Sequence, residues 1–142
     1  MNLKRISFDE IAIRYEFQLE TTGPNQFWYT LIAKFAGHYR EGSAGRPDAC
    51  FVLGMARTAV EVWHAAALVL DLSELQYQWG DEMEHLLPPD VGVPAAVVVG
   101  PGCARSIATL LWDDVNTAHE ATEAEFVFAN LQDGWENVRK RN

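Results

Sequence analysis

Two short runs of almost entirely apolar residues determine how the second half of the chain can fold. They are Ala67–Leu72 (ALVLDL) and residues 94–99 (PAAVVV). A strand can carry apolar side chains at successive positions only where both of its faces are covered, as in the middle of a parallel sheet. The two runs therefore predict two central strands with helices packed against them.

The first third of the chain is predicted to form an antiparallel hairpin. Residues 11–19 alternate for much of their length between apolar and polar side chains, as a half-buried strand does. Residues 27–35 form a second run, rich in aromatic and β-branched residues, and the turn-forming segment 21–26 (TTGPNQ) lies between the two. Residues 37–47 (GHYREGSAGRP) then have the composition of a loop.

Helical spacing of apolar residues begins near Asp48, which is expected to cap the first turn of a long helix. A second helix is expected at 103–112, and residues 126–128 indicate a short last strand. Asn130 is expected to cap a final helix, with Asp133 in the capping-box position. The expected inner faces comprise Phe51, Met55, Ala59 and Val62 in the first helix, flanked by Val52 and Trp63, and Leu131, Trp135 and Val138 in the last.

The order of these elements predicts a single α/β domain over residues 1–142. Its N-terminal antiparallel hairpin leads into a mostly parallel sheet of four to five strands packed with helices, because alternating helices and strands imply right-handed crossovers. A chain of 142 residues that is 49% hydrophobic can fill one such core.

The charge of the chain restricts its partners. The net charge is −9, and residues 48–142 carry fifteen acidic but only five basic residues. Such a surface repels nucleic acid and anionic lipid, and it suits either a basic protein partner or solubility alone. No apolar run approaches the roughly 20 residues of a membrane helix, and residues 1–5 lead into a charged segment instead of a secretory signal, so we expect a cytoplasmic protein.

The sequence marks no catalytic residue, metal site or cofactor. Cys50 and Cys103 are too few for a disulfide framework and are expected to be reduced. An acidic cluster with one histidine occupies 81–85, but at helical spacing Glu82 points away from Asp81, Glu84 and His85, so we expect solvated carboxylates and a helix capped by Asp81. Triad partners can be distant in sequence, and whether the chain is an enzyme therefore stays open.

Residues 67–138 resemble the second half of a STAS domain, the family of anti-sigma factor antagonists and of the cytoplasmic tails of sulfate transporters. In that family a strand with the pattern vvlDLS.v.fiDSSGl precedes a helix, a strand ending near glycine, another helix, a short strand and a last helix. Here ALVLDLSELQYQWGDEM supplies the first strand and its loop, PAAVVVGPG the next strand, and FVFANLQDGWENV the last strand and helix. The clearest match is Leu70-Asp71-Leu72-Ser73, followed by apolar Leu75 and Tyr77.

The resemblance implies a regulatory module whose phosphorylation switch is absent or locked. The family's DSSG segment aligns with Trp79-Gly80-Asp81-Glu82, so the position of the phosphorylated serine is Asp81. An aspartate cannot accept phosphate from a serine kinase, although its carboxylate holds part of a phosphoserine's charge. The N-terminal half departs from the family, because the loop at 37–47 and the helix at 48–64 exceed the usual spacing.

The leading interpretation is a non-catalytic module that binds another protein through the segment 79–85. Trp79 lies in an expected loop, and an exposed tryptophan is a common interface anchor. A homodimer is also expected, because the hairpin strands leave an open sheet edge that a second copy can cover. The expected interaction residues are Trp79, Gly80, Asp81, Glu82 and His85.

Two alternatives remain open. One is a small enzyme or ligand-binding protein with an anion or ligand site at the carboxyl ends of the strands, near Ser73, Gly100, Gly102 and Cys103. A helix start would lower the pKa of the Cys103 thiol if the thiol lies in the first turn, and the same glycines are otherwise accounted for by a tight turn. The turn at 77–83 (YQWGDEM) is similar to an oxyanion-hole turn of crotonase-like enzymes, which normally need a longer chain. The other alternative is an acidic inhibitor or immunity-type protein that masks a basic surface.

Overall fold

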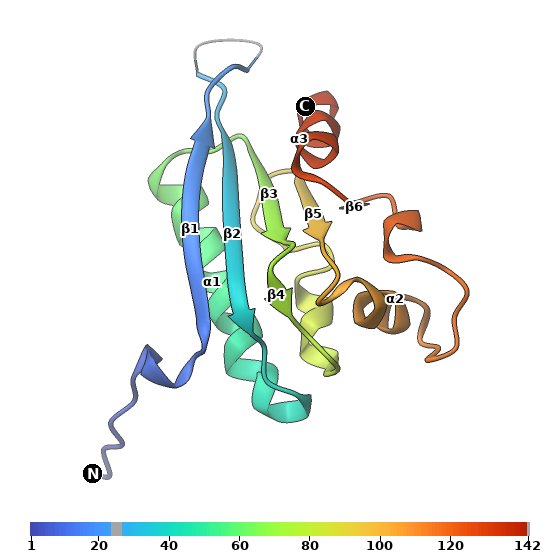
Figure 1. The fold of residues 1–142 in the computed structure, drawn as a ribbon. Helices are drawn as coiled ribbons and strands as arrows, with labels where there is room; N and C mark the ends of the chain where they lie inside the picture. Colours follow the sequence, from blue (N-terminus) through green and yellow to red (C-terminus); the bar gives the residue numbers. More distant parts are fainter. Residues whose placement is uncertain (24–26, 142) are drawn as a thin grey trace.

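The computed structural model describes residues 1–23 and 27–141, which form one mixed sheet packed with helices (Figure 1). The described strands lie in the order β1-β2-β3-β5-β6, and β4 pairs with the end of β2. Their bounds are β1 (Ile13–Glu20), β2 (Thr30–His38), β3 (Ala67–Leu72), β4 (Leu75–Gln76), β5 (Ala95–Val99) and β6 (Val127–Phe128). The helices are α1 (Arg46–Val62), α2 (Ala104–Trp112) and α3 (Leu131–Lys140), with 3-10 turns η1 (Phe8–Glu10), η2 (Gly42–Gly45), η3 (Asp81–His85) and η4 (Ala121–Glu123).

The expected hairpin is confirmed, since β1 and β2 pair antiparallel from Ile13 opposite Gly37 to Glu20 opposite Thr30. Part of the expected turn at 21–26, residues 24–26, lies outside the described residues. All further pairings in the described sheet are parallel. The predicted fold class, an antiparallel hairpin followed by a parallel α/β sheet, is therefore confirmed.

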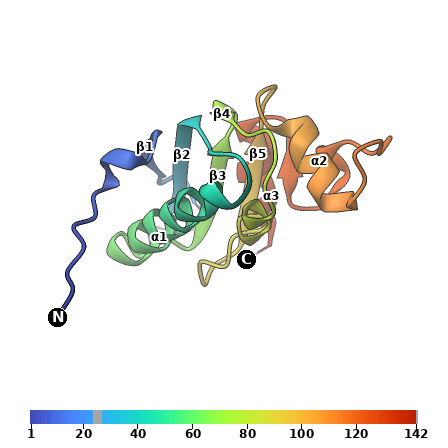
Figure 2. The ribbon, with the colours of Figure 1, turned by 90° about the horizontal axis from the view of Figure 1, so that it is seen from below.

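The two apolar runs form the fully buried strands β3 and β5. Along each strand, alternate side chains enter opposite cores because the pleat directs successive residues to opposite faces. On one face, Leu68 and Leu70 belong to a large core with α1 and α2 residues; on the other, Val69 packs with Val138 of α3. Seen from below, α1 runs along one face of the sheet (Figure 2).

The first helix differs from its prediction in its start and in its inner face. It begins at Arg46, and Asp48 lies buried in its first turn instead of capping it. The buried face includes Val52, Ala56 and Val60, whereas Val62 and Trp63 are exposed. Small side chains let the helix approach the sheet closely, while half-buried Phe51 lies at the flank, against the rings of Phe8 and Tyr15.

The expected loop at 37–47 is largely structured. Strand β2 extends to His38, η2 occupies Gly42–Gly45, and α1 has already begun at Arg46. Asp48 explains this order: its carboxylate accepts hydrogen bonds from the Arg40 backbone N–H at 2.8 Å and from the Arg40 guanidinium at 2.8 to 3.2 Å. One buried carboxylate therefore ties the chain leaving β2 to the start of α1.

The later helices follow the sequence more closely. Helix α2 begins one residue after its expected start, and Asn130 caps α3 by accepting from the backbone N–H of Asp133 at 2.9 Å. Of the expected inner face of α3, Val138 is buried, Trp135 half-buried and Leu131 exposed. No helix among the described residues is long and apolar enough to cross a membrane.

We predict that Asp48→Ala lowers the free energy of unfolding by about 3 kcal/mol, because it leaves a backbone N–H and a guanidinium without their shared acceptor. Asp48→Asn should cost less, since an amide oxygen can still accept from the Arg40 backbone. Urea unfolding measures both, with Glu61→Ala as an exposed control expected to change the free energy by less than about 0.5 kcal/mol. A loss for Asp48→Ala as small as the control's would contradict this account of the segment.

Candidate interaction site

The candidate site lies at the carboxyl ends of β2 and β4, where the chain passes from β4 into η3. Strands β2 and β4 pair in parallel at Gly37 opposite Leu75 and His38 opposite Gln76. Beyond the strands, the backbone N–H of Tyr39 donates to Gln76 O at 2.9 Å, and that of Gly42 donates to Trp79 O at 3.2 Å. The two chains therefore leave the sheet side by side, and η2 supports the loop that carries Trp79.

Two buried tyrosines lie behind this loop. The rings of Tyr39 and Tyr77 make an edge-to-face contact, with centroids 5.1 Å apart. The Tyr77 hydroxyl donates to Gly80 O at 2.8 Å. Burial, and secondarily the charge of Asp81, raises the pKa of Tyr77 to about 12, so the phenol keeps its proton and remains a donor. This bond fixes the backbone next to the exposed end of the loop.

Trp79 is largely exposed to solvent, and part of its ring lies close to Gly42 of η2. Its side chain is 61% exposed. A methyl group in place of a hydrogen on Gly42 would lie 2.8 Å from the ring atom Cη2, so a larger residue there would require the indole to shift. Gly42 and Gly80 face each other with φ of +61° and +135°, a region that side chains rarely adopt. The two glycines thus allow η2 and the Trp79 loop to approach each other closely.

The charged residues of the segment lie on a single 3-10 turn, η3, and not on a longer helix. Asp81 is exposed and begins the turn, while Gly80 occupies the cap position without any side-chain bond, so the expectation that Asp81 caps a helix is wrong. Met83 anchors the turn in the core. Pro88 and Pro89 follow shortly afterwards and cannot continue a helix.

Asp81, Glu82 and His85 leave this site acidic. His85 Nε2 lies 3.4 Å from Glu82 Oε2, a contact that becomes an ion pair when the imidazole is protonated. Within residues 1–23 and 27–141, no group of three or more histidine, cysteine, aspartate or glutamate side chains is placed to hold a metal ion. The site therefore presents an aromatic ring beside carboxylates, and not a ligand set for a cation.

The structure brings Ser73, Gly100, Gly102 and Cys103 together, but through close backbone packing. A Cβ at Gly100 would overlap the Ser73 carbonyl, and one at Gly102 would lie 2.7 Å from Leu75 O. The backbone N–H groups of Cys103 and Ala104 donate to Gly100 O at 3.2 and 2.9 Å. These two donors close the turn into α2 and are not directed at an anion.

Cys103 lies just before α2, as its cap residue, and not in the first turn where a lowered pKa was expected. Its side chain is buried, and its Sγ lies 3.3 Å from Leu72 O. Burial raises the pKa of the thiol, because it disfavours the charged thiolate. Cys50, in contrast, is exposed on α1.

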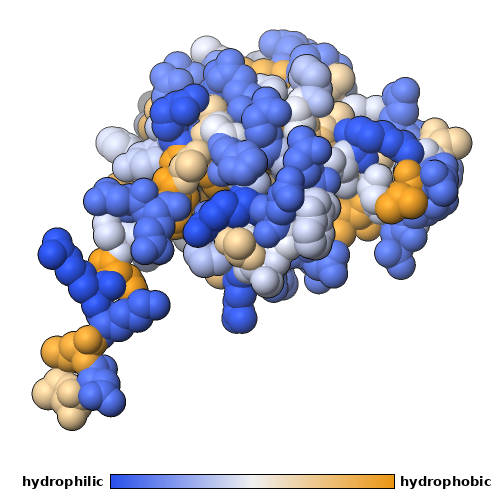
Figure 3. All heavy atoms as spheres, turned by 60° about the horizontal axis from the view of Figure 1, so that its bottom comes forward, coloured by the Kyte–Doolittle hydropathy of each residue, from blue (hydrophilic) through white to orange (hydrophobic). Residues whose placement is uncertain are grey.

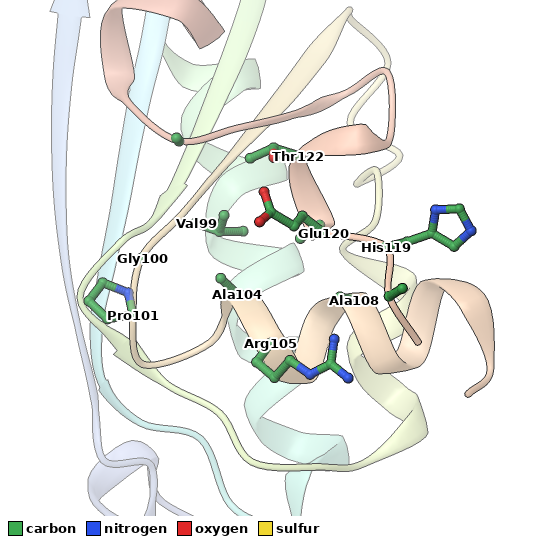
Figure 4. Close-up of a pocket in the computed structure, with 12 residues that line it drawn as sticks. Val99, Gly100, Pro101, Ala104, Arg105, Ala108, His119, Glu120 and Thr122 are labelled. Atoms are coloured by element: carbon green, nitrogen blue, oxygen red, sulfur yellow. The ribbon is translucent and has the colours of Figure 1, made fainter. Parts of the chain in front are cut away.

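A groove of about 590 Å³ lies beside α2, at the carboxyl end of β5, and Gly100, one of the residues expected near a ligand site, lines it (Figure 4). Val99, Ala104 and Ala108 contribute apolar lining, and Arg105 and Glu120 add charge. His119 also borders the groove, but its ring points away from it and stacks on Trp112, with centroids 4.8 Å apart. The sequence thus indicated this end of β5, but it did not connect the segment 118–122 with the site.

We predict that the two cysteines differ in reactivity. A water-soluble disulfide reagent should modify Cys50 at least about tenfold faster than Cys103, because only the former is exposed and the latter has a raised pKa. The rate of thiolate release measures this, and Cys50→Ser should remove the fast phase. A fast phase that survives Cys50→Ser and disappears in Cys103→Ser would restore the reactive-cysteine interpretation.

The comparisons with known proteins address the fold. No protein-family model matches the sequence, and no curated protein matches it either. The crystal structure of an anti-sigma factor antagonist from Mycobacterium paratuberculosis matches with a TM-score of 0.58 and 20% sequence identity, over 90% of this chain and 95% of that one. The resemblance noted for residues 67–138 thus extends to most of the chain at the level of structure, and the protein has the STAS-like fold of an anti-sigma factor antagonist.

Proposed function

We propose that this chain is a non-catalytic, protein-binding regulatory module of the STAS type. Its interaction face consists of Trp79, Gly80, Asp81, Glu82 and His85. The observation that carries the proposal is Trp79, a large aromatic residue that is exposed on a loop whose backbone is hydrogen-bonded to η2. The solved structure with the same fold is named an anti-sigma factor antagonist, and we extend a regulatory role to this chain by that analogy.

An exposed tryptophan on an ordered loop suits a binding anchor. A loop whose backbone is already ordered loses little conformational entropy when a partner covers it, and the large surface of the indole gives much binding energy. The bonds that order the loop are internal: Gly42 N–H to Trp79 O, and the Tyr77 hydroxyl to Gly80 O. These bonds support the proposal of a partner with a pocket for the ring.

The acidic residues around Trp79 favour a basic partner in this proposal. Asp81 and Glu84 are exposed, Glu82 is half-buried, and His85 is the basic group beside them. We propose that the partner carries Lys or Arg side chains around its tryptophan pocket, because opposite charges at the rim speed association and fix orientation.

In this proposal, a serine kinase cannot change the charge of the module at position 81. In the STAS resemblance it is the place of the phosphorylated serine, and here it holds an exposed aspartate. Without a hydroxyl, the position cannot be switched by a serine kinase, and it carries a carboxylate in place of a phosphate group. The interaction would then depend on the abundance of the two proteins.

We predict that Trp79→Ala weakens binding of the partner by about 30-fold or more, the loss typical of an interface anchor. Trp63→Ala is the matched control: it removes a similarly exposed tryptophan, 53% against 61%, at the end of α1 away from η2. The tagged protein and both variants are used to capture partners from an extract of the source cells, with quantification by mass spectrometry. Titration of the purified partner then gives the Kd values.

A partner retained by wild type and Trp63→Ala but lost by Trp79→Ala supports the interaction face. Equal capture by all three proteins, or equal loss in both variants, contradicts it. Asp81→Asn separates charge from shape, since it should slow association in low salt while leaving the tryptophan contact intact.

The groove beside α2 supports a second candidate, a small-molecule binding protein. Its volume of about 590 Å³ lies in the range of ligand sites, and it is located at the end of a parallel strand, where open α/β sheets usually place ligands. Arg105 would contact an acidic group of the ligand. A metabolite that raises the Tm of wild type but not of Arg105→Ala would favour this candidate over the interaction face.

A further inference from the structure

The N-terminal segment, residues 1–11, projects from the body of the protein (Figures 1 and 3). Its apolar side chains have almost no cover: Leu3 is 87% exposed, Ile6 81% and Phe8 72%. Isolated exposed apolar residues are ordinary, but three within six positions form a patch that costs solvation free energy. Such a patch in a short segment indicates a surface that becomes covered.

The part of this segment nearest β1, residues 7–11, is ordered by two hydrogen bonds and a ring contact. Ser7 Oγ accepts from the backbone N–H of Asp9 at 3.1 Å, and the Ile11 N–H donates to Phe8 O at 3.0 Å, which closes η1. The Phe8 ring contacts the Phe51 ring of α1 edge-on, with centroids 5.6 Å apart. The segment therefore leaves the body in a defined direction, at the edge strand β1.

A groove of about 530 Å³ lies between this segment and α1. Its α1 wall includes Phe51 and Met55, and its other wall includes Ile6 and Phe8 of the segment itself. The lining is mainly apolar, with Glu10 and Arg40 among the charged residues that border it. The groove thus matches the apolar side chains of the segment in chemistry and lies directly beside them.

The charges of the segment are arranged so that a second copy, placed antiparallel to the first, presents opposite charges to it. Placed antiparallel to a second copy about Ser7, the basic pair Lys4-Arg5 of one copy meets the acidic pair Asp9-Glu10 of the other. The facing charges are the pairs Lys4-Arg5 and Asp9-Glu10, whereas Ile11 is half-buried and packs against the core of its own copy.

This self-complementarity identifies the occupant of the groove. We propose that two copies of this chain associate through their N-terminal segments about a two-fold axis near Ser7, with Leu3 and Ile6 of each copy in the groove of the other. Two-fold symmetry requires the same patch on both copies, and an antiparallel self-complementary segment satisfies that requirement. The contact is made by side chains, because η1 keeps residues 8–10 in a turn.

The test is a pair of charge reversals, followed by sedimentation velocity over a series of concentrations. Wild type should show a monomer–dimer equilibrium that weakens as salt is raised. Lys4→Glu/Arg5→Glu makes the segment wholly acidic, and Asp9→Lys/Glu10→Lys makes it wholly basic, so each variant alone should raise the dimer Kd about tenfold or more by like-charge repulsion. An equimolar mixture of the two should recover dimers, since each facing charge pair is then opposite.

A matched control separates this geometry from net charge. Glu61→Lys/Glu125→Lys makes the same charge change as Asp9→Lys/Glu10→Lys at exposed positions elsewhere. In that double variant the N-terminal segment is unchanged, so it should dimerise like wild type and should not restore dimers to the acidic variant. Far-ultraviolet circular dichroism checks that all variants are folded.

Several outcomes would overturn the proposal: a wild type that stays monomeric at every concentration, reversals that leave the dimer unchanged, or a mixture that stays monomeric. An unchanged dimer would place the contact elsewhere, for example on the open edge of β1. None of the substituted residues belongs to the interaction face, so partner capture through Trp79 can succeed or fail independently of this result.

Discussion

The burial of β3 and β5 on both faces is the constraint on which the rest of the structure depends. Neither strand exposes a side chain on either face, so helices must cover both. Leu68 and Leu70 face the core of α1 and α2, and Val69 faces α3. Parallel strands are joined by crossovers, so their carboxyl ends lie at the same edge of the sheet. The turns η2 and η3 and the start of α2 are found at that edge. The proposed interaction face and the groove beside α2 are both located where the strand ends converge.

The interaction face then depends on a chain of smaller contacts that begins with Asp48. Its carboxylate binds Arg40, which holds the segment after β2 against the start of α1. That segment continues into η2, where Gly42 supports the Trp79 ring. A buried ion pair does not have to be a large net source of stability to matter here, because its effect is to fix the position of a loop. The loop that carries the exposed Trp79 is thereby held beside η2.

Sequence reasoning succeeded where the pattern was local and the burial complete. The runs 67–72 and 94–99 could be only central strands, and Asn130 followed by Asp133 had the spacing of a helix cap. It failed at Asp48 because a carboxylate before a helical pattern has the same local signature whether it caps the helix or binds Arg40 eight residues earlier. It left the pKa of Cys103 open, because a lowered value required the thiol to lie in the first turn of a helix, whereas Cys103 precedes α2 and is buried. The inner face of α1 was misjudged for a related reason: Phe51 is covered by Phe8 and Tyr15, which belong to another part of the chain.

The distribution of charge connects the two proposed surfaces. Arg105 is the only Lys or Arg between Thr58 and Val138, so most of the body is acidic and repels a second copy. A region that carries both signs suits self-association better, and Lys4-Arg5 with Asp9-Glu10 forms such a region. Arg40 borders the groove beside this segment and also binds Asp48. That bond positions the chain that leads from β2 to Gly42. Both surfaces therefore lie at one end of the sheet, and a dimer formed there would bring two Trp79 anchors into one particle. For a partner with two binding sites, the second contact becomes intramolecular, which raises its avidity without any new contact, provided that the geometry allows both sites to engage.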